Sequence, residues 1–165
     1  MTQSAYNTAD LYDRYGDELA ICDPGFRDYG GHSEFHGRIR TLKCFEDNSL
    51  VRKLLAQPSE GEVLVVDAGG SLRCAMLGDM LAGLACDNGW AGVVVYGCIR
   101  DAAQIARMPL GVKALASHPA KSRKRGVGEE DLRVSFNGVC FTPGHHLYAD
   151  SDGIVVSAKA LNPPD

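Results

Sequence analysis

The sequence has 165 residues, 45% hydrophobic and 23% charged, which excludes a disordered chain and predicts a single globular domain over residues 1–165. The formal net charge is −4, so we expect neither the basic face of a dedicated nucleic-acid-binding domain nor a direct nucleic-acid partner. A small anionic substrate is compatible with this charge, because a nearby arginine or metal ion can override it locally.

The first third of the chain predicts two short helices separated by a loop and a strand. The loop is rich in turn-forming residues, and the strand alternates between the two faces expected of a sheet. Each helix is preceded by a side chain that can accept a hydrogen bond from its first N–H groups. The elements are a helix over 9–15 capped by Thr8, a loop over 23–34, a strand over 36–45, and a helix over 49–56 capped by Asn48 and ended by Pro58.

The central third predicts a unit of strand, loop, helix and strand. Residues 62–66 and 92–96 are short β-branched runs typical of buried strands. Residues 67–71 form a loop, and residues 79–88 carry apolar side chains at helical spacing up to an Asn-Gly end signal. The two strands should therefore be parallel and joined by a right-handed crossover.

The last third is predicted to be mainly β structure. A polar loop over 119–130 follows its first strand candidate, and Asn-Gly, Pro-Gly and Asp-Gly turns separate the others. The strand candidates are residues 112–116, 133–136, 139–141 and 153–157. We therefore expect an α/β domain with a central β-sheet flanked by helices, and not a doubly wound nucleotide-binding fold.

The six cysteines and the lack of a targeting signal predict a cytoplasmic protein. No C-x-x-C pair is present, no cysteine has zinc-type spacing with a histidine, and most cysteines lie in apolar stretches. Such thiols are usually buried in the protein core, and free thiols are typical of proteins in a reducing compartment. We recognise neither a signal peptide nor an apolar stretch of membrane-spanning length, so we expect no membrane partner.

Three polar residues are predicted to meet at one edge of the sheet. Asp79 stands at the start of the central helix, and Arg100 and Asp101 follow the next strand. Because parallel strands deliver the chain to one edge and the helix starts there, these residues should converge where α/β sheets bind ligands. The helix start adds free N–H groups that suit a carboxylate, and Gly78 lets a ligand approach the backbone.

These groups suit the cleavage of a carbon–carbon bond next to a 2-oxo acid. The leaving electrons must be held as an enolate, which a divalent cation can stabilise as a Lewis acid. Aspartate oxygens suit Mg²⁺ or Mn²⁺, arginine binds a carboxylate or a polarised carbonyl oxygen, and a second carboxylate can orient a water. No lysine lies in an apolar motif at this edge, which disfavours a Schiff-base aldolase.

A purely structural interpretation competes with this one. Asp79 and Asp101 are both suited to be helix N-caps, because aspartate is a favoured capping residue. Arg100 could be a solvated charge or half of a surface ion pair. Sheet geometry alone leaves these alternatives open.

The central motifs resemble those of a known family. The stretches Gly78-Asp-Met-Leu81, Asn88-Gly-Trp-Ala-Gly-Val-Val-Val-Tyr-Gly97 and Arg100-Asp101 resemble the RraA-like family of 4-hydroxy-4-methyl-2-oxoglutarate aldolases and regulators of ribonuclease activity A. The spacing from Asp79 to Arg100 is that of the family's D-x20-R-D signature. Ala75 departs from the family pattern, which often has glycine there, and this predicts a slightly altered loop. Further similarity, at residues 26–31, 43–48, 65–70 and 146–153, extends over almost the whole chain.

The resemblance implies a swivelling β/β/α fold and a homotrimer or a hexamer of two trimers. It implies that Asp101 coordinates the divalent metal, Arg100 binds the substrate and Asp79 orients a catalytic water. A substrate carboxylate would be held at the helix N-terminus by residues 78–81, which are Gly78, Asp79, Met80 and Leu81.

The resemblance also implies the reaction of a class II, metal-dependent aldolase. The substrate would be 4-hydroxy-4-methyl-2-oxoglutarate, cleaved to two pyruvates, with oxaloacetate decarboxylation as a secondary activity through the same pyruvate enolate. The family also contains regulators that bind and inhibit ribonuclease E, and this alternative stays open. The presence of Asp79, Arg100 and Asp101 favours the enzyme.

Three other features invite a functional interpretation. The five histidines lack zinc-type spacing, and the adjacent His145 and His146 would face opposite sides of a strand, so polar surface or turn roles are favoured over metal binding. Residues 67–71 lack the lysine of a P-loop and are better explained as a tight turn. Residues 121–125 form a basic run, for which a solvated loop is favoured and RNA or an acidic partner are the alternatives.

Overall fold

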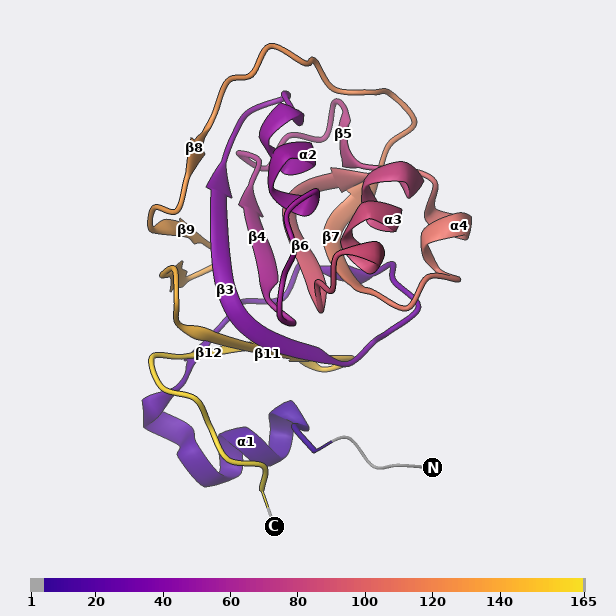
Figure 1. Cartoon of the computed structure of the whole chain (residues 1–165). Coiled ribbons are helices and arrows are strands. Elements are labelled where there is room, and N and C mark those ends of the chain that lie inside the picture. The colour runs from indigo at the N-terminus through magenta and orange to yellow at the C-terminus, as the bar shows by residue number, and fades with distance from the viewer. Residues whose placement is uncertain (1–4, 165) are drawn as a thin grey trace.

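A mixed β-sheet forms the centre of the molecule, and α2, α3 and α4 lie on one side of it (Figure 1). The computed structural model describes residues 5–164. This arrangement confirms the predicted α/β fold with a central sheet and flanking helices. In chain order the elements are α1 (Thr8–Tyr15), the 3-10 helix η1 (Gly16–Glu18), β1 (Ala20–Ile21), β2 (Arg27–Asp28), β3 (Phe35–Lys43), α2 (Ser49–Leu55), β4 (Val63–Asp67), β5 (Ala75–Leu77), α3 (Asp79–Asp87), β6 (Gly92–Ile99), α4 (Ala102–Ile105), β7 (Gly111–Ser117), β8 (Glu129–Glu130), β9 (Val134–Phe136), β10 (Val139–Phe141), β11 (His146–Asp150) and β12 (Gly153–Ser157).

The parallel part of the sheet contains β3, β4, β6 and β7 in this order. β4 pairs in parallel with β3 on one side and with β6 on the other, and β6 pairs in parallel with β7. The parallel relation predicted for residues 62–66 and 92–96 is therefore confirmed. Parallel neighbours place their carboxyl ends at one edge, which is where the candidate site is found.

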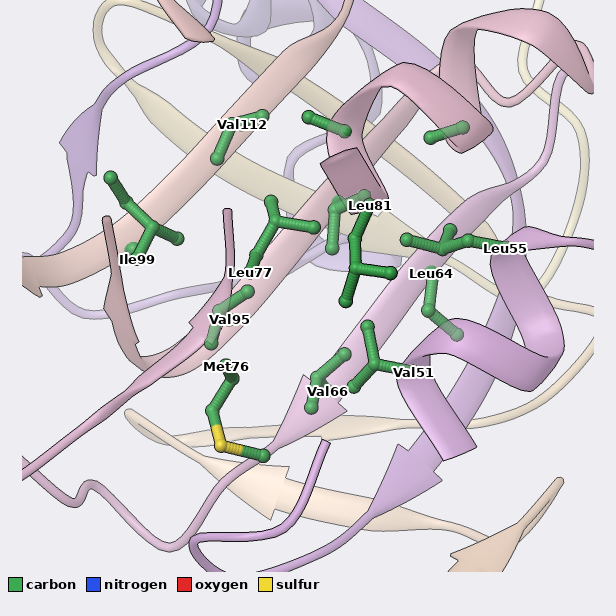
Figure 2. Close-up of a cluster of buried hydrophobic side chains, with 14 of the residues drawn as sticks. Val51, Leu55, Leu64, Val66, Met76, Leu77, Leu81, Val95, Ile99 and Val112 are labelled. Carbon is green, nitrogen blue, oxygen red and sulfur yellow. The ribbon is translucent and has the colours of Figure 1, made fainter. Parts of the chain in front are cut away.

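Alternate residues of β4 enter two different apolar cores. Leu64 packs in the cluster that contains Leu55 of α2 and Leu81 of α3 (Figure 2). Its neighbours Val63 and Val65 enter a second cluster, which the β9–β10 hairpin covers. Because both faces of the strand are covered, all five residues of β4 are buried, which explains the unbroken apolar run over 63–66 that precedes Asp67.

The strand β3 joins the parallel and antiparallel parts of the sheet, and Figure 1 shows it as a long, curved strand. Residues 35–38 pair antiparallel with β11, and residues 39–43 pair in parallel with β4. β11 continues antiparallel into β12, which pairs with β1. β3 thus belongs to both the antiparallel and the parallel part of the sheet, so a movement of one part relative to the other would bend this strand.

Of the two helix caps predicted in the first third, Thr8 is wrong, and Asn48 is confirmed as the N-cap residue but makes no side-chain capping bond. Asn7, not Thr8, caps α1, because the N–H and hydroxyl of Thr8 donate to the carboxylate of Asp150. Asn48 occupies the N-cap position of α2, but the N–H of Ser49, the first helical residue, donates to the side chain of Asp47 and not to that of Asn48. At both helices the capping hydrogen bond is thus made by the side chain one residue before the predicted one.

The sequence-based prediction missed several short elements. Periodicity does not distinguish strands of two or three residues from loops, and β2 lies within the stretch predicted as a loop. The missed elements are η1, β1, β2, β5, β8, α4 and the longer β11. The strand β5 matters most, because it leads the chain directly into α3.

The ring of Phe35 lies against two glycines of adjacent parallel strands. Gly92 of β6 and Gly111 of β7 are register partners. A Cβ added at Gly111 would lie 2.0 Å from the nearest ring carbon of Phe35, and one at Gly92 would lie 2.4 Å away. The buried aromatic side chain therefore depends on the missing side chains of both glycines.

We expect Gly111→Ala to lower the free energy of unfolding by about 1–3 kcal/mol, since the added methyl overpacks a closed core. The matched control is Gly83→Ala in α3, where a Cβ would meet no atom within 4 Å. That change should be neutral or stabilise by up to about 1 kcal/mol, because alanine is the better helix former. Urea denaturation of both variants checks this expectation, and equal stabilities would contradict it.

Candidate active site

A cavity of about 300 Å³ opens at the carboxyl edge of the parallel strands. Its walls come from the start of α2, from β5 and the start of α3, from the end of β6, and from the loop after β7. All six residues predicted from the sequence to form the site line this cavity. The lining residues are Asn48, Ser49, Arg52, Ala75, Gly78, Asp79, Met80, Leu81, Arg100, Asp101, Lys121, Ser122 and Lys124.

The pairing of β5 with the end of β6 brings the two halves of the site together. Ala75 is the register partner of Cys98, and Leu77 that of Ile99. The N–H of Arg100 donates to the carbonyl of Leu77 at 2.9 Å. The sequence predicted that the first strand of the central unit would lead to this edge, but a separate strand, β5, makes the final approach. Ala75, the departure from the family pattern, lies in this strand and lines the cavity.

The carboxylate of Asp101 is held at the N-terminus of α3. Its Oδ2 accepts a hydrogen bond from the N–H of Asp79 at 3.0 Å. The backbone of Asp101 is left-handed, with φ 58° and ψ 42°, which is uncommon for a residue other than glycine. This conformation belongs to a turn that brings the carboxylate to the N-terminus of α3. The N-terminus is the positive end of the dipole of this nine-residue helix.

Neither aspartate caps with its side chain the helix at whose start it lies. The N-cap of α3 is Gly78, and Asp79 is the first helical residue. Asp101 stands at the N-cap position of α4 but makes no side-chain capping bond there. It binds the start of the other helix instead, so the two chain segments of the site are connected by a charged hydrogen bond.

Gly78 provides the space for this contact. A Cβ at this position would lie 2.9 Å from Oδ2 of Asp101 and 3.5 Å from both Cγ and Nε of Arg100. The backbone of Gly78 is extended, with φ −124°, so a side chain is excluded by the neighbouring groups and not by backbone conformation. A larger residue would displace the carboxylate, the guanidinium or both.

Arg100 has hydrogen-bonding capacity left for a ligand. Its Nη1 donates to the carbonyl of Pro119 at 3.4 Å, and a guanidinium has five N–H donors in all. Among the residues that the structure describes, the ion pairs are Arg40–Asp131, Lys53–Glu130, Arg73–Glu46 and Lys113–Asp28. Arg100 is therefore not half of a surface ion pair, which was one of its structural interpretations.

The donor groups at the cavity fit a hard divalent cation that keeps part of its water shell. Asp79 and Asp101 are the lining residues with carboxylates, and residues 5–164 contain no cluster of three metal-binding side chains. A closed zinc site needs four protein ligands, whereas Mg²⁺ is typically held by one or two carboxylates with waters and substrate oxygens. The chain's own residues thus fit Mg²⁺ or Mn²⁺ and not a structural zinc ion.

The sequence analysis missed the lining residues of α2 and the basic loop. Asn48 was interpreted as a helix cap, and the run over 121–125 as a solvated loop. The structure places Lys121, Ser122 and Lys124 in the cavity wall. The resemblance at residues 43–48 includes Asn48 but none of these three residues, and no short-range pattern connects them to Asp101.

Asp47 fixes the basic loop to the start of α2. The side chain is buried, and Oδ2 accepts hydrogen bonds from the N–H groups of Arg125 at 2.7 Å and Val127 at 3.3 Å. Oδ1 accepts from the N–H and the hydroxyl of Ser49. Burial by itself would raise the pKa of Asp47, but these hydrogen bonds favour the charged form and lower it to about 2.

The other candidate features are structural. All six thiols are free, four of them buried, and burial with nearby acidic groups raises the pKa of Cys22 to about 11 and of Cys44 to about 12. These two thiols stay neutral and behave as small apolar groups. Gly69 and Gly70 have positive φ values, as expected for the tight turn predicted at residues 67–71.

In the part of the chain that the structure describes, no helix has the length and apolarity needed to cross a membrane.

The molecule is thus an α/β protein in which two aspartates and Arg100 line a cavity at the carboxyl ends of parallel strands. The RraA-like family (Aldolase/RraA) matches residues 7–156, and the chain belongs to this family. A protein of Laribacter hongkongensis (strain HLHK9), named "Putative 4-hydroxy-4-methyl-2-oxoglutarate aldolase", is 59% identical over 154 residues, which cover 93% of this chain and 97% of that protein.

Two solved structures share the fold closely but have different names. The first, from Geobacillus kaustophilus HTA426, is described as S-adenosylmethionine:2-dimethylmenaquinone methyltransferase; it has a TM-score of 0.92 and 51% identity, covering 94% of this chain and 96% of that one. The second is the RNA-processing inhibitor RraA from Thermus thermophilus, with a TM-score of 0.91 and 46% identity over 94% of each chain. One fold thus has three different functional names, so the function must be argued from the site.

We expect Asp47 to contribute about 1–2 kcal/mol of stability at neutral pH, because its pKa is lower in the folded chain than the ordinary 3.8. For a carboxyl with a lowered pKa, this contribution is complete above the unfolded value and is lost as the pH falls from about 4 towards 2. Asp47→Asn should remove it, so the stability gap between wild type and variant should be largest above pH 5 and should close near pH 2. Denaturant unfolding at several pH values measures the gap, and a gap that is independent of pH would contradict the assignment.

Proposed function

We propose that the protein is a divalent-metal-dependent aldolase that cleaves 4-hydroxy-4-methyl-2-oxoglutarate to two pyruvates. The observation that carries this proposal is the Asp101 carboxylate, fixed at the N-terminus of α3 beside Arg100 in one cavity. The aldolase name of the relative that is 59% identical supports the same reaction. A reducing, cytoplasmic location is consistent with the free thiols.

The binding of the 2-oxo acid would use the start of α3 and Arg100. The N–H groups of Met80 and Leu81 belong to the first turn of the helix, where backbone donors have no partner within the helix. They can donate to the substrate carboxylate, which the helix dipole also favours. Arg100 can donate to the 2-oxo oxygen, where negative charge develops as the carbon–carbon bond breaks.

The two aspartates would have separate tasks. Asp101, with Asp79 nearby, would hold Mg²⁺ or Mn²⁺, and the bound cation would supply Lewis-acid stabilisation of the developing negative charge. Asp79 would orient a water that accepts the proton of the C4 hydroxyl as the C3–C4 bond breaks. The C4 fragment leaves as one pyruvate, and the electron pair of the broken bond forms the enolate of the other. Return of a proton to C3 of this enolate completes the reaction.

The same site would decarboxylate oxaloacetate. Loss of carbon dioxide from oxaloacetate leaves its bonding electrons in pyruvate enolate, which the same groups would stabilise. No additional residue is needed, because carbon dioxide departs without a proton acceptor. By the family resemblance we further expect the active form to be a homotrimer or hexamer, which light scattering can measure.

We expect pyruvate release from both substrates to require Mg²⁺ or Mn²⁺ and to stop when a chelator is added. Asp101→Asn should lower turnover about a thousandfold, since the loss of a metal ligand removes several kcal/mol of transition-state stabilisation. Gly78→Ala should lower it at least about tenfold by displacing the groups that Gly78 accommodates. A coupled pyruvate assay measures each rate.

The control for these variants is Gly83→Ala, which adds the same methyl group to α3 where there is space for it. It should retain wild-type turnover. Failure of the wild type to release pyruvate from either substrate with either metal would refute the aldolase proposal, and full activity of Asp101→Asn would refute the site assignment.

A second candidate function is regulation of RNA decay by binding ribonuclease E. The observation that favours it is the 46% identity to the RNA-processing inhibitor of Thermus thermophilus over 94% of each chain. Under this hypothesis the chain should bind purified ribonuclease E at micromolar concentration and slow its cleavage of RNA. Asp101→Asn should bind equally well, because the contact would use the surface and not the cavity.

A further inference from the structure

A turn that begins at a histidine holds the side chain of Arg100 in the cavity. The turn directly follows β7 and consists of His118, Pro119 and Ala120. Nη1 of Arg100 donates to the carbonyl of Pro119 at 3.4 Å. Within residues 5–164 the guanidinium makes this hydrogen bond and no other, so its orientation depends on the conformation of the turn.

The two ends of the turn are bonded to the strands that build the site. The N–H of His118 donates to the carbonyl of Ile99, the last residue of β6, at 2.8 Å. The carbonyl of Ala120 accepts from the N–H of Ala75, the first residue of β5, at 2.8 Å. The parallel strands β6 and β7 lie side by side in Figure 1, so the turn starts at the same edge of the sheet as the cavity.

The half-buried side chain of His118 closes the turn. Its Nδ1 accepts a hydrogen bond from the N–H of Ala120 at 3.1 Å. Proline has no N–H, so this is the first backbone donor that follows His118 in the chain. A side-chain acceptor for the N–H two residues further on is the arrangement by which asparagine and aspartate stabilise turns.

The peptide group between Pro119 and Ala120 takes part in both side-chain hydrogen bonds. Its N–H donates to His118, and its carbonyl accepts from Arg100. Because a trans peptide group is planar, its N–H and C=O point in opposite directions and rotate together. Without the acceptor on His118 this peptide is free to rotate, and its carbonyl would then turn away from Arg100.

We propose that His118 is a positioning residue, which orients the guanidinium of Arg100 toward the 2-oxo oxygen through the peptide group between Pro119 and Ala120. This inference rests on the proposed function, which gives Arg100 the task of stabilising charge on that oxygen. His118 does not line the cavity, so it acts on the substrate through Arg100 and not by contact.

The hydrogen bond to Ala120 also defines the protonation state that His118 needs. Nδ1 accepts only without a proton, so the neutral ring carries its proton on Nε2, whereas a protonated imidazole has donors at both nitrogens. The other ionisable residues within two positions of the turn or of its backbone partners are Arg73, Cys74, Cys98, Arg100, Asp101 and Lys121. Burial raises the pKa of both thiols. Histidine is the side chain that changes charge between pH 5 and 8, so acid should loosen the turn.

His118→Asn and His118→Leu form a matched pair, because the two new side chains have almost the same shape and only asparagine has an acceptor at the position of Nδ1. With Mg²⁺ at pH 8, His118→Leu should lower kcat for pyruvate release at least about tenfold, while KM changes less than about twofold. The reason is that Arg100 would act where charge develops, whereas the substrate carboxylate binds at α3. His118→Asn should keep at least about half of the wild-type kcat. Between pH 8 and pH 5.5, kcat of the wild type should fall at least about threefold more than that of His118→Asn.

Two measurements do not depend on turnover. The ¹⁵N chemical shifts of His118 in the wild type at pH 8 should show the proton on Nε2. Isothermal calorimetry with Mg²⁺ compares pyruvate with oxalate, which has a charged oxygen where the enolate oxygen would form. His118→Leu should weaken the binding of oxalate at least about fivefold and that of pyruvate less than about twofold.

The control variant is His32→Leu, which removes a histidine at the opposite end of β7, where His32 bridges to Gly111. It should match the wild type in every measurement. Unfolding curves show whether each variant is folded, and if His118→Leu is not, the ¹⁵N shifts and the pH comparison with His118→Asn decide.

A proton on Nδ1 of the wild-type His118 overturns the positioning role. Equal pH profiles of the wild type and His118→Asn, full activity of His118→Leu, or wild-type binding of neither oxalate nor pyruvate overturn it as well. If the wild type releases no pyruvate but oxalate binding follows the expected pattern, the positioning role stands and the aldolase proposal fails. If the wild type releases pyruvate and His118→Leu does so equally fast, only the positioning role fails.

Discussion

The pairing of β6 with its neighbours is the constraint on which the site depends. β4 pairs with the first part of this eight-residue strand, and β5 pairs with its last residues. Because β5 and β6 end side by side, the start of α3 and the Arg100–Asp101 turn must meet. The hydrogen bond from Asp79 N–H to Asp101 then joins the two segments. If β6 were two residues shorter, which is one repeat of the strand, the carboxylate of Asp101 would not reach the start of α3.

The second consequence of this geometry is a cationic cavity in an acidic protein. The four ion pairs of residues 5–164 lie elsewhere, and none of them includes the four cations that line the cavity. Glycine at position 78 leaves the space in which the carboxylate and the guanidinium approach each other. Asp47 does not line the cavity, but its buried carboxylate accepts hydrogen bonds from Arg125 and Val127, in the loop that contains the lining residues Lys121 and Lys124. Residues that stabilise the fold at this edge therefore also shape the cavity.

The relatives of this chain show how little the fold alone says about activity. An aldolase name, a methyltransferase name and an RNA-processing inhibitor belong to chains that align with most of this one. A central sheet with helices on one side is compatible with each of them. The proposed enolate-forming reaction therefore rests on the charged groups at the cavity and not on the fold. A regulatory surface would not need Asp101 to be held at a helix N-terminus.

The sequence by itself determined the fold class, the parallel central unit and the three polar residues at its edge, because apolar periodicity and turn residues are local signals. The D-x20-R-D spacing and the family resemblance suggested their roles. The tertiary structure decided what depends on distant contacts. It inserted β5 before α3, directed Thr8 to Asp150 so that Asn7 caps α1, and placed Lys121 and Lys124 in the cavity wall. These features could not be predicted from neighbouring residues, since the pairing of β5, the Thr8–Asp150 contact and the bonds from Arg125 and Val127 to Asp47 join segments far apart in the chain.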